Sequence, residues 1–247
     1  MTVRSEPPGR LLLVRHGQTE WSRSGRHTGL TDLSPTPDGE RDARALAPLL
    51  APFHPVEVLS SPLERARRTA ELAGLTPTTD ADLVEWDYGG YEGRTTAQIR
   101  EDLGDPAWTV FDQGVVPGAT PGETVEEVAA RASRVLARIT PSLETGDVAL
   151  FAHGHLLRIL AATWLRQPAR FGASLLLRAG GRALGAGHPD VEPDASLRQP
   201  TTHGASRHPV VQGIRSFRAA ARCAPARWSP CARRTAQASG SAPRCGC

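Results

Sequence analysis

The chain contains no lysine, because all 29 of its basic residues are arginine. Residues 1–222 also lack cysteine, which fits a reducing compartment. The four cysteines are Cys223, Cys231, Cys245 and Cys247. Their spacings match no zinc-finger or zinc-ribbon pattern, so we expect no metal site.

No apolar run approaches the roughly 20 residues that span a bilayer, and residues 1–10 lack the apolar stretch of a signal peptide. We therefore expect a cytoplasmic protein with no membrane partner.

The net charge of +3 conceals an uneven distribution. Residues 195–247 hold nine arginines and no acidic residue, whereas residues 1–194 hold the other 20 basic residues and all 26 acidic ones. An arginine-rich tail that binds nucleic acid is one interpretation, and it predicts affinity that falls steeply with salt. The only aromatic residues there are Phe217 and Trp228, and exclusive use of arginine indicates a GC-rich coding sequence. We therefore expect no nucleic-acid partner.

Strand and helix signals alternate between residue 10 and about residue 170. Continuous apolar runs at 11–14, 56–59 and 148–152 predict buried strands, and residues 18–35 read as a loop. Capping residues and apolar periodicity predict helices over 36–50, 61–74, 124–139 and 156–165. With 39% hydrophobic residues the chain can bury a core. The alternation predicts an α/β fold, a three-layer α/β/α sandwich around a mainly parallel sheet.

Histidine and arginine follow the predicted strands. Arg15, His16 and Gly17 come after the first strand, Arg65 lies in the first turn of the helix after the second, and the stretch 153–155 (HGH) follows the third. Such a histidine taken alone is more often a structural residue. In parallel sheets, however, ligands bind beyond the carboxyl ends of the strands. Arginines that converge there with helix N-termini favour a phosphate pocket, so we expect a phosphate ester as ligand.

Five segments resemble those of a known family, the histidine phosphatase superfamily, which includes cofactor-dependent phosphoglycerate mutases and many bacterial acid phosphatases. They are residues 12–21 (LLVRHGQTEW), 60–70 (SSPLERARRTA), 83–93 (LVEWDYGGYEG), 121–124 (PGET) and 151–158 (FAHGHLLR). They cover about residues 10–170 in the order typical of that family. The resemblance implies a phosphoglycerate mutase-like sandwich.

The resemblance also implies catalytic roles. His16 would be the nucleophile that forms a phosphohistidine, and Arg15, Arg65 and His153 would hold the phosphoryl oxygens. Glu85 would protonate the leaving alcohol and then activate water, which requires a raised pKa. Neither a cofactor nor a metal is implied. Further contacts with the substrate are expected from Gly17, Gln18, Thr19, Ser22, Gly154 and His155.

Other polar and aromatic residues are expected to be peripheral. His27 and His54 read as surface residues, and Glu123 reads as a cap of the helix that follows it. Arginines at three positions of the helix 124–139 read as a solvated face; they are Arg131, Arg134 and Arg138. Aromatic residues near the predicted site are expected either to line its mouth or to pack in the core; they are Trp21, Trp86, Tyr88 and Tyr91.

The phosphatases and mutases of this family differ in whether water or a second acceptor takes the phosphoryl group. Residues 95–122 contain a single arginine, Arg100, and Ser22 and His155 stand where the mutases typically carry asparagine. The stretch 15–33 resembles acid phosphatases and a sugar-bisphosphatase branch. We predict a phosphomonoester hydrolase that acts on a small phosphorylated metabolite, as a monomer or a homodimer. The alternatives are a phosphoglycerate mutase and a non-catalytic binder of phosphorylated ligands.

The resemblance stops near residue 171. We expect a catalytic domain over residues 1–178, in which residues 173–177 are the candidate closing strand. Residues 179–247 form a basic low-complexity tail that is expected to be disordered. An out-of-frame reading of GC-rich DNA is the other interpretation of this tail.

Overall fold

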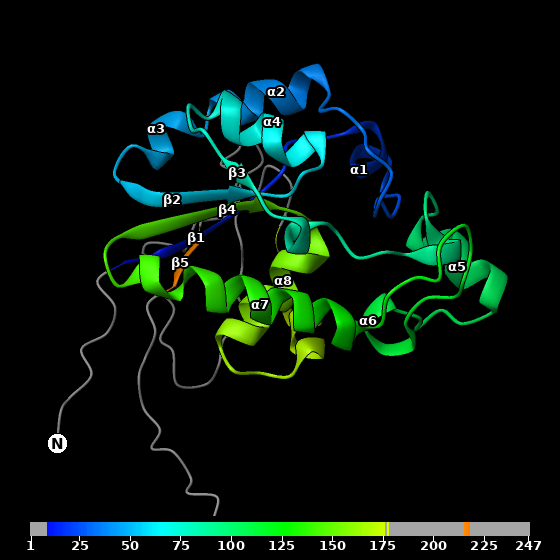
Figure 1. Cartoon of the computed structure of the whole chain (residues 1–247). Coiled ribbons are helices and arrows are strands. Elements are labelled where there is room, and N and C mark those ends of the chain that lie inside the picture. The colour runs from blue at the N-terminus through cyan, green and yellow to red at the C-terminus, as the bar shows by residue number, and fades with distance from the viewer. Residues whose placement is uncertain (1–8, 176, 178–214, 218–247) are drawn as a thin grey trace, which may run out of the picture.

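The structure, a computed structural model, describes residues 9–175, 177 and 215–217 (Figure 1). Its sheet has the order β3-β2-β4-β1-β5. The strands are β1 (Leu11–Arg15), β2 (Pro55–Ser60), β3 (Thr78–Thr79), β4 (Asp147–Ala152) and β5 (Arg215–Phe217). β4 pairs in parallel with β1 and β2, β2 pairs in parallel with β3, and β5 runs antiparallel to β1. The predicted mainly parallel sheet is therefore confirmed.

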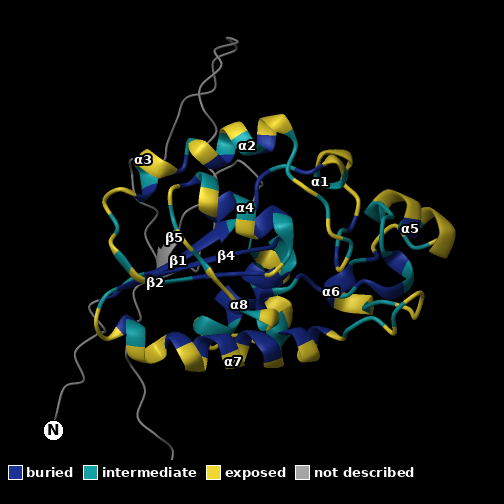
Figure 2. Cartoon of the chain, turned by 45° about the horizontal axis from the view of Figure 1, so that its top comes forward, coloured by how far each residue is buried: buried dark blue, intermediate teal, exposed yellow. Residues whose placement is uncertain are grey.

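Helices cover both faces of this sheet (Figure 1). Leu12 and Val14 of β1 pack in the core on one face, with α3 and α4, whereas Leu11 and Leu13 pack with α7 and α8 on the other. Figure 2 shows buried strands between helices whose outer surfaces are exposed. The helices are α1 (Glu20–Ser24), α2 (Pro37–Arg44), α3 (Ala47–Leu50), α4 (Glu64–Leu72), α5 (Thr96–Leu103), α6 (Val110–Gln113), α7 (Val125–Leu143) and α8 (Gly154–Trp164), with short 3₁₀ turns η1 (Ala81–Leu83), η2 (Gly89–Tyr91) and η3 (Ala169–Ser174). The predicted three-layer sandwich is confirmed.

Three helix predictions need correction at their ends. The stretch 36–50 forms two helices, because Pro48 cannot donate a backbone N–H and its ring clashes with the carbonyl of the residue four positions earlier. The helix predicted from residue 61 begins at Glu64, whose backbone N–H donates to Asp32 at 2.9 Å. The last helix begins at Gly154, not at residue 156. A cap supplied by a distant loop, such as Asp32, leaves no local signal.

Two segments predicted to be irregular or extended differ from expectation. The loop 18–35 contains α1, which begins with a capping box between Thr19 and Ser22. The described residues of 173–177 form no closing strand, because residues 173 and 174 belong to the 3₁₀ turn η3 and Leu175 is an isolated bridge residue. The strand at that edge of the sheet comes from residues 215–217 instead. The rest of the predicted tail 179–247 lies outside the described residues. Among the described helices none is long and apolar enough to cross a membrane.

Candidate active site

His16 follows β1 directly and extends its pairing with β4. Its backbone N–H donates to the Ala152 carbonyl at 2.9 Å, and its side chain is 4% exposed. The Nδ1 atom lies 2.7 Å from the Gly17 carbonyl, which can only accept, so the ring proton is on Nδ1 and Nε2 keeps its lone pair. Burial lowers the pKa of His16 well below its usual value, and the positive charges of Arg15 and Arg65 lower it further. His16 is therefore a neutral imidazole with a free nucleophilic nitrogen.

His153 occupies the N-cap of α8, and its ring centroid lies 5.2 Å from that of His16. Its Nδ1 accepts a hydrogen bond from Arg65 Nε at 3.1 Å, so its proton is on Nε2. Burial lowers the pKa of His153 well below the usual value, with Arg65 as the next cause. Nε2 is buried and has no hydrogen-bond partner among the described residues. His153 thus supplies an N–H donor that lacks an acceptor.

Arg65 lies in the first turn of α4 and is completely buried. Its Nη1 donates to the Thr31 carbonyl, and its Nη2 donates to the carbonyls of Thr28 and Gly29. Burial lowers the pKa of Arg65, an effect that the Glu85 charge opposes, and guanidinium stays protonated. Arg65 therefore orients His153 and the loop 28–31.

Arg15 ends β1 and points toward the same place. Its Nη1 donates to the Leu177 carbonyl at 3.0 Å, whereas its buried Nε has no partner among the described residues. A side-chain carbon at Gly154 would lie 3.3 Å from the guanidinium carbon of Arg15, so glycine permits this close approach. Within the described part of the chain, the partners of Arg15 and Arg65 are carbonyls and one imidazole. Among the described residues, the positive charges of the completely buried Arg65 and the half-buried Arg15 thus lie without a bonded carboxylate.

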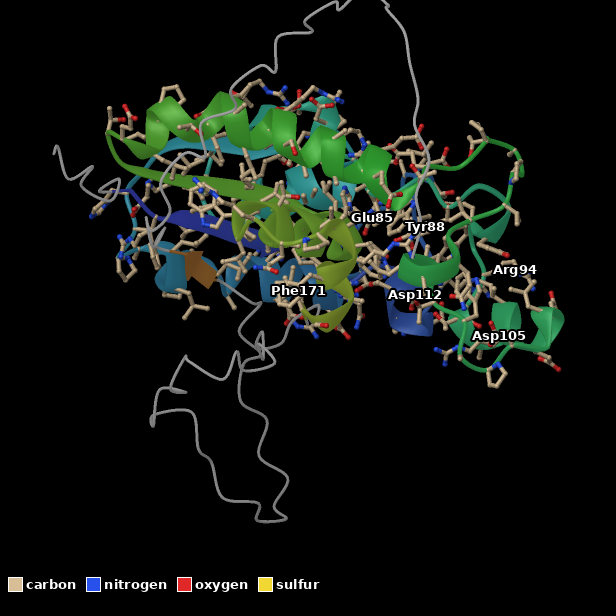
Figure 3. All side chains as sticks on the ribbon, turned by 90° about the horizontal axis from the view of Figure 1, so that it is seen from below. Glu85, Tyr88, Arg94, Asp105, Asp112 and Phe171 are labelled. Carbon is tan, nitrogen blue, oxygen red and sulfur yellow. The ribbon has the colours of Figure 1, made fainter. Side chains whose placement is uncertain are left out.

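Glu85 lies in the loop between η1 and η2 and is 4% exposed. Its carboxylate accepts backbone N–H bonds from Trp86 at 2.9 Å, His155 at 3.1 Å and Leu156 at 2.9 Å. The N-cap residue of α8 makes no side-chain capping bond, so Glu85 caps this helix from a distant part of the chain. Figure 3 places Glu85 and Tyr88 at the end of the sheet that faces α5.

Arg131 and Glu123 hold the loop that carries Glu85. Arg131 pairs with Glu123 at 2.7 Å and donates to the carbonyls of Asp82 and Val84. Glu123 also accepts the backbone N–H of Asp87. The prediction that Arg131 belongs to a solvated face was therefore wrong, because it is 9% exposed. The predicted cap role of Glu123 was wrong too, since the capping box of α7 is formed by Thr124 and Glu127.

A cavity of about 230 Å³ opens at this edge of the sheet. Its wall contains six of the residues proposed from the sequence, namely Arg15, His16, Ser22, Glu85, Gly154 and His155. Arg65 and His153 are completely buried and lie outside the wall. The structure thus brings the proposed nucleophile and the proposed acid to one cavity.

Three residues predicted to contact the substrate bind other parts of the protein. The backbone N–H of Gly17 donates to Thr69 Oγ1 at 2.9 Å. The Gln18 side chain accepts from the Thr36 hydroxyl, and the Thr19 hydroxyl accepts from the Ser22 backbone. These bonds hold the loop after β1, and contact of Gly17, Gln18 or Thr19 with a substrate stays a prediction.

His27 was predicted to be a surface residue, and this was wrong. It is 9% exposed, lines the cavity and lies 4.8 Å from the Tyr88 ring between ring centroids. Burial lowers its pKa to about 4. His27 lies in an irregular loop, where no periodicity marks a buried position. Other residues of the cavity wall that sequence reasoning missed are Arg26, Thr28, Thr96 and Arg158.

The remaining single-residue predictions concern one histidine and four aromatic residues. His54 is exposed, as predicted. Tyr88 lines the cavity, whereas Trp86 and Tyr91 belong to the hydrophobic core. Trp21 is half-buried and packs near the guanidinium of Arg26.

A family model described as the histidine phosphatase superfamily (branch 1) matches residues 11–180. The chain belongs to this superfamily. An acid phosphatase of Mycobacterium tuberculosis is 41% identical over 163 residues, which are 64% of this chain and 77% of that protein. A sedoheptulose 1,7-bisphosphatase of Saccharomyces cerevisiae is 37% identical and covers 63% of this chain and 67% of that protein.

Other members of the histidine phosphatase superfamily complete the comparison. A 2,3-bisphosphoglycerate-dependent phosphoglycerate mutase of Cytophaga hutchinsonii is 33% identical over 61% of this chain and 74% of that protein. The solved structure of an open reading frame of Mycobacterium tuberculosis superposes with a TM-score of 0.62 at 40% identity, covering 67% of this chain and 84% of that one. The family resemblance found in the sequence and the predicted fold are therefore confirmed.

Proposed function

We propose that this histidine phosphatase is a phosphomonoester hydrolase that forms a phosphohistidine at His16 and acts on a small phosphorylated metabolite. The observation that carries the proposal concerns two buried polar atoms beside His16, Arg15 Nε and His153 Nε2, which have no hydrogen-bond partner among the described residues. A buried donor without an acceptor is costly, and a phosphoryl group supplies oxygens for both. The relatives named acid phosphatase and bisphosphatase support hydrolysis.

The first chemical step uses the free lone pair of His16. Nε2 attacks phosphorus, the P–N bond forms, and the ester P–O bond breaks. Glu85 gives its proton to the departing alcohol oxygen. Charge that develops on the phosphoryl oxygens is stabilised by the Arg15 guanidinium and by the N–H of His153. Arg65 acts through His153, because its Nε donates to the other ring nitrogen.

The second step releases phosphate. Glu85, now a carboxylate, takes a proton from water while the water oxygen attacks phosphorus. The P–N bond breaks and His16 recovers its lone pair. The bonds from the first turn of α8 stabilise the negative charge on Glu85 at this stage.

Phosphoglycerate mutase is the second candidate, because Arg26 and Arg158 line the cavity and suit a second anionic group. Arg158 already donates to the carbonyls of Gly172 and Ala173. Arg100, the single arginine of residues 95–122, donates to the Trp108 carbonyl and does not line the cavity. The segment that would close over a mutase site thus brings no guanidinium to the cavity wall. Hydrolysis is favoured.

The test compares wild type with His16→Ala on p-nitrophenyl phosphate and quenches the wild type during turnover. We expect the variant to lose hydrolysis and the quenched wild type to carry acid-labile phosphate at His16. Equal rates would contradict the proposed nucleophile. A phosphoglycerate mutase assay on the same preparation separates the two candidate functions, and binding of phosphate without any turnover would favour the non-catalytic alternative.

Several further properties belong to the same proposal. We propose catalysis without a metal or other cofactor, so activity is predicted to survive EDTA. A cytoplasmic location is supported by the lack of cysteine in residues 1–222. We also propose that residues 1–178 are the catalytic domain and that residues 179–247 add no catalytic group. Neither a nucleic acid nor a membrane is proposed as partner, and the mass of the protein in solution distinguishes a monomer from a homodimer.

A further inference from the structure

Three polar rings line the cavity together with Arg15, Arg26 and Arg158. The backbone N–H of His155 donates to Glu85, which places this residue on the side where the leaving alcohol receives its proton. The Tyr88 hydroxyl lies 2.5 Å from Nδ1 of His155. The His27 ring lies 4.8 Å from the Tyr88 ring and 5.9 Å from the His155 ring, measured between centroids. All three residues line the cavity.

The charge state of the two bonded groups follows from their burial. Burial raises the pKa of Tyr88 well above its usual value, and the nearby negative charge of Glu85 adds to this. Burial also lowers the pKa of His155 well below its usual value, with the positive charge of Arg158 as the next cause. Near neutral pH the hydroxyl therefore keeps its proton and the imidazole is uncharged.

These states fix the direction of the hydrogen bond. Within the described part of the chain, the Tyr88 hydroxyl has no other partner, so it donates to Nδ1 of His155. The ring proton of His155 is then on Nε2. Nε2 bonds to none of the described residues and is not among their fully buried unpartnered atoms. His155 therefore presents an N–H donor to the cavity, beside the proposed acid.

We propose that His155, in the tautomer set by Tyr88, donates a hydrogen bond from Nε2 to a hydroxyl of the leaving alcohol, so that the natural substrates are phosphate esters of small polyols. This inference rests on the proposed phosphomonoesterase function. A leaving group without a hydroxyl would displace water from the Nε2–H group of His155 and leave this donor unpaired. The cost of the unpaired donor selects against that ester. Hydroxyl groups of Thr28 and Thr96 line the same cavity and suit further hydroxyls of the substrate.

The experiment compares two esters that differ only in the hydroxyls of the leaving group, glycerol 3-phosphate and propyl phosphate. The measured quantity is the ratio of their kcat/KM values. We expect the wild type to favour glycerol 3-phosphate about tenfold, the size of one well-formed uncharged hydrogen bond. His155→Phe keeps a ring against Trp86 and Phe111 but removes the donor, and the ratio should fall to about one.

Two more variants distinguish recognition from a general loss of structure. Tyr88 is a positioning residue, and Tyr88→Phe frees the His155 tautomer, so its ratio should fall about threefold. His155→Gln restores an N–H donor and should recover part of the ratio. His54→Gln, at an exposed site far along the chain from the cavity residues, serves as the control and should keep the wild-type ratio.

The outcomes separate the inference from the proposed function. A wild-type ratio near one, or a ratio that His155→Phe leaves unchanged, would overturn the role of His155 while hydrolysis itself stands. Failure of the wild type to hydrolyse p-nitrophenyl phosphate as well as both alkyl esters would overturn the proposed function, and this inference with it.

Discussion

Two imidazoles in this site carry their protons on opposite nitrogens. A carbonyl fixes the proton of His16 on Nδ1, and a guanidinium fixes the proton of His153 on Nε2. One ring therefore offers a lone pair and the other offers an N–H, although both are buried and neutral. The difference between the proposed nucleophile and the proposed oxyanion donor thus comes from one hydrogen-bond partner at each ring.

The role of Glu85 predicts a dependence on the leaving group. Glu85→Gln keeps the size of the side chain and removes the proton. We expect kcat/KM, which reports the step that releases the alcohol, to fall by about 10²–10⁴-fold for an alkyl phosphate. The fall should be much smaller for p-nitrophenyl phosphate, because its phenolate leaves without protonation. The two esters are compared by kcat/KM, since kcat also contains the attack of water, for which Glu85 is the proposed base with either ester. An equal fall of kcat/KM for both esters would contradict the proposed role of Glu85 as acid.

The buried His27 predicts a loss of stability in acid. Its pKa is lowered from 6.5 to about 4 in the folded state, so between these values the unfolded chain binds more protons. The free energy of unfolding therefore decreases as the pH falls through this window, by about 1.4 kcal/mol per pH unit from this residue. Above pH 6.5 the contribution vanishes.

His27→Gln removes this titration and keeps a polar partner for the Thr96 hydroxyl, which lies 3.2 Å from the His27 ring. Between pH 6.5 and pH 5 the variant should lose about 2 kcal/mol less stability than the wild type. Urea unfolding at both pH values measures this difference. The exposed His54→Gln provides the matched control and should follow the wild type. Parallel losses in wild type and His27→Gln would contradict the assignment.

Sequence reasoning located His16, Glu85 and Arg15 because each follows a buried strand or lies in a motif. It did not show which polar groups were already engaged within the protein. Gln18 and Thr19 lie close to His16 in the chain, yet their side chains bond to the loop and to α1. These internal hydrogen bonds depend on tertiary contacts, and the spacing of residues along the chain does not predict them.

At the scale of elements, the loop that carries Glu85 is held from α7. Arg131 joins this helix to Glu123 and to two carbonyls ahead of Glu85. The apolar periodicity of α7 predicted the helix as far as residue 139, one turn before its end at Leu143, and its capping box predicted its start. Periodicity placed Arg131 on the polar side of the helix, but the loop folds over that position and buries it.

Arg131→Met tests this support. Removal of the guanidinium leaves Glu123 without its partner, so we expect a loss of about 2–3 kcal/mol in the free energy of unfolding together with a lower kcat. Arg134→Met is the matched control, because its pair with Asp82 is exposed and is worth under about 1 kcal/mol. Thermal unfolding and kinetics on one alkyl ester measure both effects. Equal destabilisation by the two variants would contradict the proposed support.

At the scale of the whole molecule, the carboxyl edge of the sheet collects groups from stretches that lie far apart along the chain. The alternation of elements predicted a parallel sheet, but not that β4 would lie between β1 and β2. The order of the strands in the sheet depends on the paths of the loops that connect them and on the packing of the helices against the sheet. For the same reason no pattern in the sequence predicted that residues 215–217 would pair with β1.

The proposed division of the chain into a catalytic domain and a tail predicts the behaviour of a shortened protein. A chain that ends at residue 178 keeps the proposed catalytic groups and loses β5, which leaves one edge of β1 unpaired. We expect turnover of p-nitrophenyl phosphate to persist and aggregation to increase with concentration, since open strand edges template association. Light scattering beside an activity assay measures both. Loss of turnover in monomeric, folded protein would place a catalytic contribution within residues 179–247.

The capping of α8 by Glu85 has a consequence for motion during turnover. In the proposed mechanism the Glu85 carboxyl group carries a proton in the first step, and a protonated oxygen is a weaker acceptor for the backbone N–H groups of His155 and Leu156. The first turn of α8 would then open more readily before the alcohol leaves than after it. Amide hydrogen exchange at His155 and Leu156 would measure this difference.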